Sequence, residues 1–403
     1  MTKISRTTDM TQGSEMRHII MFSLPLLAGN LLQQTYNIVD TMVVGRYLGD
    51  DALAAVGATG SITYLFYTLC IGLSVGAGII VAQYFGAGKK KALRSAVFNS
   101  ALVTAIFGIV ISLLSVPAAK PILELLKVPD KLIGDSVAYM QIACGGTIAV
   151  AAYNWINAIM RALGDSKTPL IFLGAASLLN ALLDLLFVVV FKFGIAGAAW
   201  ATVLTQALSA ISCIVYCFAV SGEIKLTADD LHADKDMMNR CVKTGVPIAI
   251  QNGLISVSMV ALQRVTNGFG ETVMAAYTVS MRIEQFVQQP FSSLNAAVST
   301  FTGQNIGAGQ EKRAQKGLAC AIKISVIFSA VVLVLFTLFG GAITSWFVKG
   351  KTVISISAKA LIITSLFYWS LGIIHTTRGF LNGAGDTNYA LVNGMAEVIC
   401  RIG

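Results

Sequence analysis

The sequence predicts an all-α polytopic membrane protein, built as two six-helix lobes that are related by a parallel tandem repeat. Three observations support this prediction: the composition, a succession of apolar stretches of membrane-spanning length, and motifs that recur at a fixed spacing. Of the 403 residues, 55% are hydrophobic and 12% are charged, whereas soluble domains contain about 25% charged residues. A chain this poor in charge is typical of a protein that lies mostly within a bilayer.

The apolar stretches fall into two groups, six before a polar segment and five after it. They lie at 19–45, 52–82, 95–117, 132–160, 168–191 and 194–219, then at 244–266, 273–302, 318–347, 354–381 and from 388 onward. The polar segment, 221–240, predicts a cytoplasmic connector between an N-terminal lobe, 1–220, and a C-terminal lobe, 241–403. Gly403 falls about ten residues short of a full span, so we expect an incomplete last helix.

The basic residues predict the orientation in the membrane. The net charge is +9, but Lys and Arg are spread over short connectors, which is typical of topology control rather than of nucleic-acid binding. An N-terminus in the cytoplasm places the more basic connectors there as well: Lys89, Lys90, Lys91 and Arg94; Arg161 and Lys167; Lys225, Lys235, Arg240 and Lys243; Lys312, Arg313 and Lys316. Residues 1–16 lack the apolar core of a removable signal peptide.

Two motifs recur at one spacing. QYFGAGKKKA begins at Gln83 and QNIGAGQEKR begins at Gln304, 221 residues later, and GDSKT at Gly164 returns as GDTNY at Gly385 with the same spacing. Because six spans separate the copies, both halves have the same orientation, and such halves enclose a central cavity. The glycines at 72–78 have two interpretations, a pliable helix along a transport path or close helix packing.

The first predicted span carries polar side chains at membrane depth. Gln33, Asn37 and Asp40 share one helical face, and a carboxylate inside a bilayer persists only where partners or a water-filled cavity receive it. Asn180 and Asp184 lie one turn apart in the fifth span. Their oxygen atoms suit H⁺ or Na⁺; the alternative is that Asp184 only bonds neighbouring helices. We expect no tightly bound metal, only a transported Na⁺ at Asp40 and Asp184.

The second half has no acidic counterpart of Asp40, because the repeat places Ala261 or Leu262 there. It offers Glu284, which lies either at a helix end or in a cavity wall. It also offers His375, which either bonds a neighbouring helix or carries a proton. The two halves are therefore expected to share a scaffold and to differ in chemistry.

Polar and large side chains within the spans are the candidates for a substrate cavity. They are Gln33, Gln34, Tyr36, Asn37, Tyr64, Tyr67, Asn154, Asn157, Met259, Gln263, Glu284 and His375. Aromatic and Met side chains suit a promiscuous cavity, and lipid-facing packing is the alternative for them. We predict no enzyme, because GAGKKK lacks the spacing of a phosphate-binding loop and the polar loops are too short for a catalytic domain.

Several motifs resemble those of the multidrug and toxic compound extrusion (MATE) family. They are NIVDTMVVGRYLG from Asn37, the QYFGAG and QNIGAG pair, RALGDSKTP from Arg161 and RGFLNGAGDT from Arg378. The resemblance implies twelve helices in two lobes, here cut within the eleventh, and cation-coupled antiport of organic cations. It also implies a cation-coupling site at Asp40, Asn180, Asp184 and Thr202. Acidic residues that other members carry in the seventh and tenth helices are missing, which disfavours a second Na⁺ site.

The predicted function is therefore a monomeric antiporter of the cytoplasmic membrane that exports organic cations or drugs in exchange for H⁺ or Na⁺, without another cofactor and without a nucleic-acid partner. Two alternatives stay open. A lipid-linked oligosaccharide flippase of the same superfamily is expected to have a basic cavity, and few Arg or Lys lie in the spans. A receptor or scaffold that transports nothing has no need of a repeat with buried carboxylates.

Overall fold

The computed structural model describes residues 7–220, 224–227 and 230–402, with the backbone alone for 220, 260–261, 263–264, 267 and 401–402. Within these residues every regular element is a helix. The helices are α1 (Glu15–Leu48), α2 (Asp50–Gly86), α3 (Lys90–Leu125), α4 (Asp130–Gly145), α5 (Thr147–Ala162), α6 (Lys167–Asp184), the π-helical η1 (Leu185–Val190), α7 (Gly194–Val220), α8 (Lys235–Asn267), α9 (Glu271–Gly307), α10 (Glu311–Ser345), α11 (Lys351–Ser365), α12 (Tyr368–Ala384) and α13 (Thr387–Ile402).

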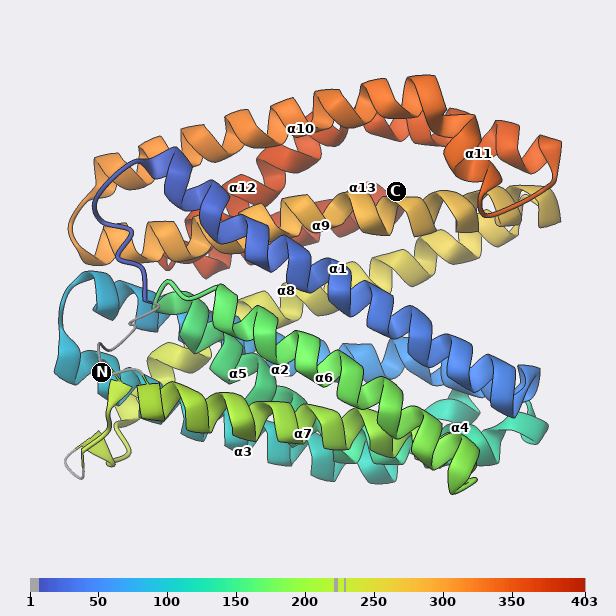
Figure 1. Ribbon diagram of the computed structural model, residues 1–403, viewed down its shortest axis with the longest axis horizontal. Coiled ribbons are helices and arrows are strands. Elements are labelled where there is room, and N and C mark those ends of the chain that lie inside the picture. Colours follow the sequence, from blue (N-terminus) through green and yellow to red (C-terminus); the bar gives the residue numbers. More distant parts are fainter. Residues whose placement is uncertain (1–6, 221–223, 228–229, 403) are drawn as a thin grey trace.

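Two lobes lie side by side, with α1 crossing diagonally between them (Figure 1). We call α1–α7 the N-lobe and α8–α13 the C-lobe. The first helix of each half begins against the other lobe: Ile19 and Phe22 of α1 share a hydrophobic cluster with Phe301 of α9, and Met237 and Cys241 of α8 belong to the core of the N-lobe. Each half is thus held at its start by the other one.

Every predicted span is a helix, and most helices extend beyond the predicted limits. The fourth and tenth spans are each a bent pair, with 42° between α4 and α5 and 51° between α11 and α12. Among the described helices, five are long and apolar enough to cross a membrane, or seven if each bent pair is one span. The long helices α1 and α9 are not among them because polar side chains lower their mean hydropathy, and both line the space between the lobes, as α8 does. The predicted connector is helical from Lys235 onward.

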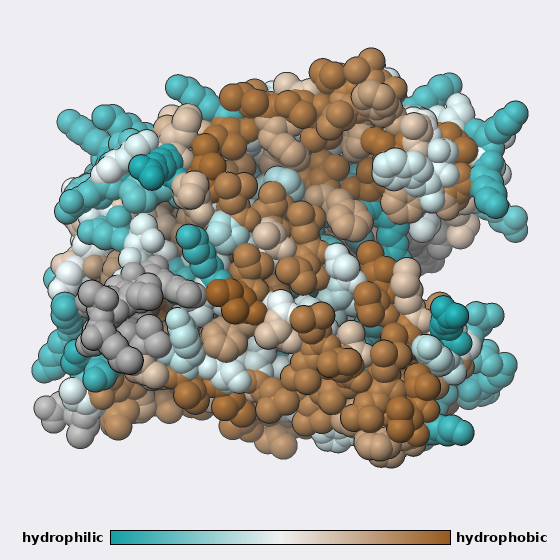
Figure 2. Space-filling view, viewed as in Figure 1, coloured by the Kyte–Doolittle hydropathy of each residue, from teal (hydrophilic) through white to brown (hydrophobic). Residues whose placement is uncertain are grey.

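On the face that Figure 2 shows, hydrophobic side chains form a broad belt across the middle of the molecule, and hydrophilic ones gather at its two ends. The helices run between these ends, so the belt has the place and direction of a bilayer. The surface is hollowed between the lobes at the end opposite the start of α1 (Figure 2). The protein is therefore open between its lobes at one end.

The repeated motifs join the lobes at the other end. The Gln83 side chain of α2 donates to the carbonyl oxygen of Gly383 at 3.0 Å, and the Gln304 side chain of α9 donates to that of Ala162 at 2.9 Å. The 221-residue repeat maps Gln83 onto Gln304 and Ala162 onto Gly383. The two bonds are thus the same contact made twice, once in each direction.

Two glycines lie at the same crossing of α2 and α9. A Cβ atom added to Gly86 would overlap the carbonyl oxygen of Gln304, and one added to Gly307 would overlap that of Gln83. These positions are again 221 residues apart. Only glycine lets the two backbones approach this closely.

The glycines of α2 between residues 72 and 78 serve close packing. A Cβ atom at Gly72 would overlap the backbone of Ala249, and one at Gly76 would overlap that of Gly245, both on α8. The helix α2 runs without a break through this stretch. Of the two interpretations of these glycines, the structure thus shows close helix packing.

Candidate functional site

Helix α1 presents the predicted polar face to a cavity of about 500 Å³ inside the N-lobe. Gln33, Asn37 and Asp40 all line it, as helical spacing requires. Other predicted residues on its wall are Tyr36, Tyr64, Tyr67, Asn154, Asn157 and Thr202. Most of the N-lobe candidates therefore share one cavity.

The carboxyl groups of Asp40 and Asp184 lie close to each other. Asp184 is completely buried, and neither of its carboxyl oxygens has a hydrogen-bond partner among the described residues; Asp40 Oδ1 has none either. Two carboxylates this close repel each other unless a proton or a cation lies between them. The pair therefore has the chemistry of a site for one small positive charge.

The backbone changes form directly after Asp184. Helix α6 ends at this residue and continues as the π-helical turn η1, Leu185–Val190. Such turns are rare, and they occur often at functional sites, where they change the direction of neighbouring side chains. The change from α-helix to π-helix therefore falls directly after Asp184, the acidic residue of the fifth predicted span.

Asn180 and Thr202 complete the predicted coupling set. Asn180 is buried, and neither its amide nitrogen nor its amide oxygen has a partner among the described residues; it lines a small adjoining cavity together with Gln33 and Tyr36. The hydroxyl groups of Tyr36 and Thr202 interact. Buried polar atoms without partners are costly, so a cluster of them indicates a place for an ion, a proton or water.

Oxygen atoms dominate this cluster, and oxygen is the ligand that hard cations prefer. Within the described residues, no group of three or more His, Cys, Asp or Glu side chains could hold a metal ion. The oxygen atoms of this cluster are thus of the kind that a hard cation such as Na⁺ prefers.

The other candidates lie apart from this cluster. Gln34 and Met259 line neither the N-lobe cavity nor the cavity between the lobes, and the side chain of Gln263 lies outside the described residues. Glu284 is neither at a helix end nor on those two walls, because it lies well inside α9 and interacts with Thr364 and Tyr368 in the C-lobe. The Glu284 carboxylate thus interacts within the C-lobe and lines neither of the two cavities.

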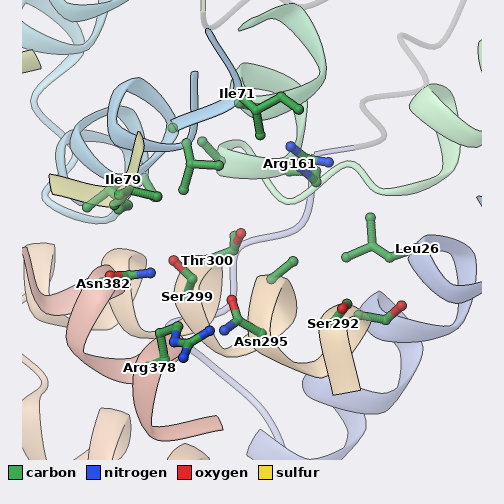
Figure 3. A pocket seen from close by; sticks show the side chains of 18 of the residues that line it. Leu26, Ile71, Ile79, Arg161, Ser292, Asn295, Ser299, Thr300, Arg378 and Asn382 are labelled. Carbon is green, nitrogen blue, oxygen red and sulfur yellow. The ribbon is translucent and has the colours of Figure 1, made fainter. Parts of the chain in front are cut away.

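A second cavity, of about 360 Å³, lies between the lobes. Figure 3 shows Arg161 and Ile71 on its N-lobe wall, with Ser299, Asn295 and Arg378 on the C-lobe wall. His375 lines it as well, and its ring stacks on Phe291 at 6.2 Å between ring centroids. His375 accepts a hydrogen bond through its backbone oxygen, from Asn295.

Arg161 is the cavity residue that the sequence analysis missed. The charge pattern assigned it to a connector, but it lies in the last turn of α5 and lines both cavities. The missed signal is its spacing, because Arg161 follows Asn157 by one helical turn and shares its face. Arg378 on the opposite wall donates to Glu397 of α13 at 3.0 Å.

Comparisons with known proteins agree with the predicted family. A sequence model of the MatE family matches residues 25–186 and 247–403. The probable multidrug resistance protein YoeA of Bacillus subtilis is 31% identical over 393 residues, which cover 96% of this chain and 85% of that protein. The probable multidrug resistance protein YpnP of the same organism is 29% identical over 386 residues, covering 95% and 86%.

Solved structures share the fold. The outward-facing conformation of a multidrug resistance MATE family transporter of the MOP superfamily has a TM-score of 0.90 at 23% identity, covering 98% of this chain and 88% of that one. The family match spans both halves of the repeat, as the reciprocal contacts of α2 and α9 do. The chain therefore belongs to the MatE family of multi-pass membrane transporters.

Proposed function

We propose that the protein is a cation-coupled antiporter that exports organic cations or drugs across the cytoplasmic membrane. H⁺ or Na⁺ binds at Asp40, Asn180, Asp184 and Thr202, and no other cofactor takes part. The single observation that carries this proposal is that the carboxyl groups of Asp40 and Asp184 lie close together beside a cavity, without hydrogen-bond partners among the described residues for three of their oxygen atoms. The relatives named as multidrug resistance proteins supply the substrate class.

Coupling follows from competition. A cationic substrate and the coupling cation both seek the negative charge of the Asp40 pair, so binding of one weakens binding of the other. The lobes, 1–220 and 241–403, alternate about the connector 221–240, and the N-terminus is cytoplasmic. In this orientation the described conformation is closed towards the cytoplasm, and the cation entering from outside displaces the substrate. One chain contains both lobes, so the working unit is a monomer.

The test is dye efflux from vesicles that contain the purified protein, driven by an imposed pH gradient or an imposed Na⁺ gradient. Asp40→Asn and Asp184→Asn keep the shape of the side chain but remove its charge. We expect each to lower gradient-driven efflux at least about tenfold, because a charge-assisted interaction of roughly 1.5 to 3 kcal/mol is lost.

Asp51→Asn is the matched control for both variants. It makes the same chemical change at the exposed start of α2, where Asp51 pairs with Lys131 at 2.7 Å, and an exposed pair contributes little. Efflux by this variant is expected to equal that of the original protein. Full coupling in Asp40→Asn would overturn the site assignment, and efflux that ignores both gradients would overturn antiport.

One observation favours a second candidate function, the flippase. Arg161 and Arg378 give the cavity between the lobes the basic character that a pyrophosphate-linked lipid requires. The same vesicles, loaded with a fluorescent pyrophosphate-linked lipid in place of the dye, test it. Movement of that lipid between leaflets without dye efflux would replace the proposed antiporter by the flippase. Movement of neither would indicate a receptor or scaffold.

A further inference from the structure

The cavity between the lobes contains a cationic group without a partner. The guanidinium of Arg161 makes no hydrogen bond or ion pair with any residue that the structure describes, and the titratable group near it is Tyr153, a phenol. It is only partly exposed, and what is exposed faces the two cavities. An unpaired guanidinium at this depth is costly unless an anion reaches it.

The two arginines of this cavity differ in their surroundings. Arg378 already has an acidic partner, Glu397, at 3.0 Å. Among the described residues that line the cavity, none is Asp or Glu. Nothing in the wall therefore neutralises Arg161, and the positive charge is available to a molecule inside the cavity.

The opposite wall supplies hydrogen-bond donors. Ser292, Ser299 and Thr300 of α9 line the C-lobe side of the cavity across from Arg161 (Figure 3). A planar guanidinium with hydroxyl groups facing it is the arrangement that binds a carboxylate, since the guanidinium donates two parallel bonds and the hydroxyl groups donate to the remaining lone pairs.

The cationic group is connected to the acidic pair. Arg161, Leu26, Asn30 and Ile71 line both cavities, so the two spaces meet at these residues, and Asp40 lies further along the N-lobe cavity. Asn30 and Asp40 are both on α1, and ten helical residues span about 15 Å. One continuous passage thus offers a positive group at the junction that Asn30 borders and a negative group further along it.

We propose that Arg161 forms an anion subsite that takes the carboxylate of a zwitterionic substrate whose cationic end faces Asp40. This inference rests on the proposed export function, to which it adds the residue that binds the carboxylate of the substrate. A free inorganic anion is the competing occupant. A free anion would also bind to Arg161. In that case, however, the protein would bind the zwitterion no more tightly than a cation with the same skeleton.

Two dyes with one skeleton provide the test: tetramethylrhodamine, a zwitterion with a free carboxylate, and its ethyl ester, a cation. Binding to purified protein in detergent is measured by fluorescence polarisation for the original protein, Arg161→Gln and Arg161→Lys. Arg46→Gln is the control, because Arg46 is also in the last turn of its helix but is exposed at the opposite end. Size-exclusion profiles and unfolding temperatures confirm that each variant is folded.

We expect Arg161→Gln to weaken binding of the zwitterion about ten- to a hundredfold and to leave the ester unchanged. Arg161→Lys, which keeps the charge without the planar fork, is expected to fall between. Should Arg161→Gln not fold, Arg161→Lys alone decides, because it must still weaken the zwitterion and spare the ester. Equal effects on both dyes, or no effect on either, would overturn the subsite.

The same titration with added sodium phosphate separates the two occupants. If phosphate competes with the zwitterion and the original protein binds both dyes equally, the site holds a free anion and the proposal is overturned. Because binding is measured without a gradient, a failure of cation coupling would leave these results unchanged. The subsite and the antiport function therefore fail in different experiments.

Discussion

The two lobes repeat one scaffold but not one chemistry. At the closed end, Gln83 and Gly86 of α2 make the same contacts as Gln304 and Gly307 of α9. In the interior the two lobes differ, because the position that corresponds to Asp40 in the repeat is Ala261 or Leu262. Packing between backbones tolerates only a few residue types, whereas a cavity wall can change once its partners change.

The arginines show the same divergence. Arg161 corresponds to Asn382 in the repeat, and Arg378 corresponds to Asn157. Each of the four side chains lines at least one of the two cavities. Each lobe has one Arg and one Asn at these positions, and the Asn comes first in the N-lobe whereas the Arg comes first in the C-lobe. The comparison indicates that the lobes share structural positions, and that the sign and place of charge distinguish them.

The largest test of the shared scaffold is the glycine pair. We expect Gly86→Ala and Gly307→Ala to lower the free energy of unfolding by similar amounts, about 3 kcal/mol each, because either new Cβ atom overlaps a backbone carbonyl that cannot move aside. Thermal unfolding in detergent measures both. A clear difference between the two would show that the crossing is less symmetric than its contacts.

Gly57→Ala on α2 and Gly341→Ala on α10 are the matched controls for that pair. Nothing lies within 4 Å of a Cβ atom at either position, and alanine is the better helix former by about 1 kcal/mol. These variants are expected to be as stable as the original protein or more so. If they lose as much stability as the crossing variants, the loss does not come from the overlap.

A smaller loss of stability is expected for the two glutamines, and the loss should differ between them. Gln304 is fully buried, accepts from the Met10 amide at 2.9 Å and donates to Ala162, whereas Gln83 is partly exposed and donates to Gly383. We expect Gln304→Ala to cost about 2 to 3 kcal/mol of unfolding free energy and Gln83→Ala about 1 kcal/mol.

Unfolding temperatures give the order of the two glutamine variants, and Gln285→Ala, at an exposed position of α9, serves as the control with no expected loss. Equal losses for Gln83 and Gln304 would mean that the N-terminal segment adds nothing to the contact. A greater loss for Gln83 would reverse the interpretation of which half is held more firmly.

The smallest expected effect concerns the connector, which joins α8 to the N-lobe. Asp230 accepts from the Thr227 amide at 2.8 Å and from its hydroxyl group at 2.7 Å, and Arg94 lies 3.7 Å away. The bonds from the Thr227 amide and hydroxyl group, and then the Arg94 charge, lower the pKa of Asp230 below its ordinary value. The ionised form therefore stabilises the fold at neutral pH.

This contribution is lost as the pH falls through the lowered pKa of Asp230, because the folded state must then take up a proton. Asp230→Asn is accordingly expected to unfold at a lower temperature than the original protein near neutral pH, and the gap should close below about pH 4. Unfolding temperatures over that range test it. A gap that is constant with pH would assign the effect to the shape of the side chain.

Much of the fold could be predicted because the apolar stretches and the repeated motifs extend over most of the sequence. The spacing of the Gln83 and Gln304 motifs predicts the repeat, and that repeat is visible again in the contacts of Gly86 and Gly307. The bends inside two spans could not be predicted equally well. Gly146 marks the first bend, but no Gly or Pro lies between Ser365 and Tyr368 to mark the second one.

The candidate site divides in the same way. Helical spacing placed Asp40 with Gln33 and Asn37 on one face, and these residues line one cavity. Spacing also sets Arg161 on the face of Asn157, one turn earlier in the same helix, but it cannot show which side chains lie opposite Arg161 in the other lobe. The residues of α9 and α12 that line the same cavity lie well over a hundred residues away from Arg161 in the sequence.

The reciprocal glutamine bonds give this single chain the interface of a twofold homodimer. Such an interface is isologous, which means that the same patch acts on both sides and is its own complement. In a true dimer one mutation changes both copies of the contact, but here each copy is encoded separately and can drift alone. Either half, expressed by itself, would present a donor whose acceptor belongs to the missing half, and two identical halves could satisfy each other.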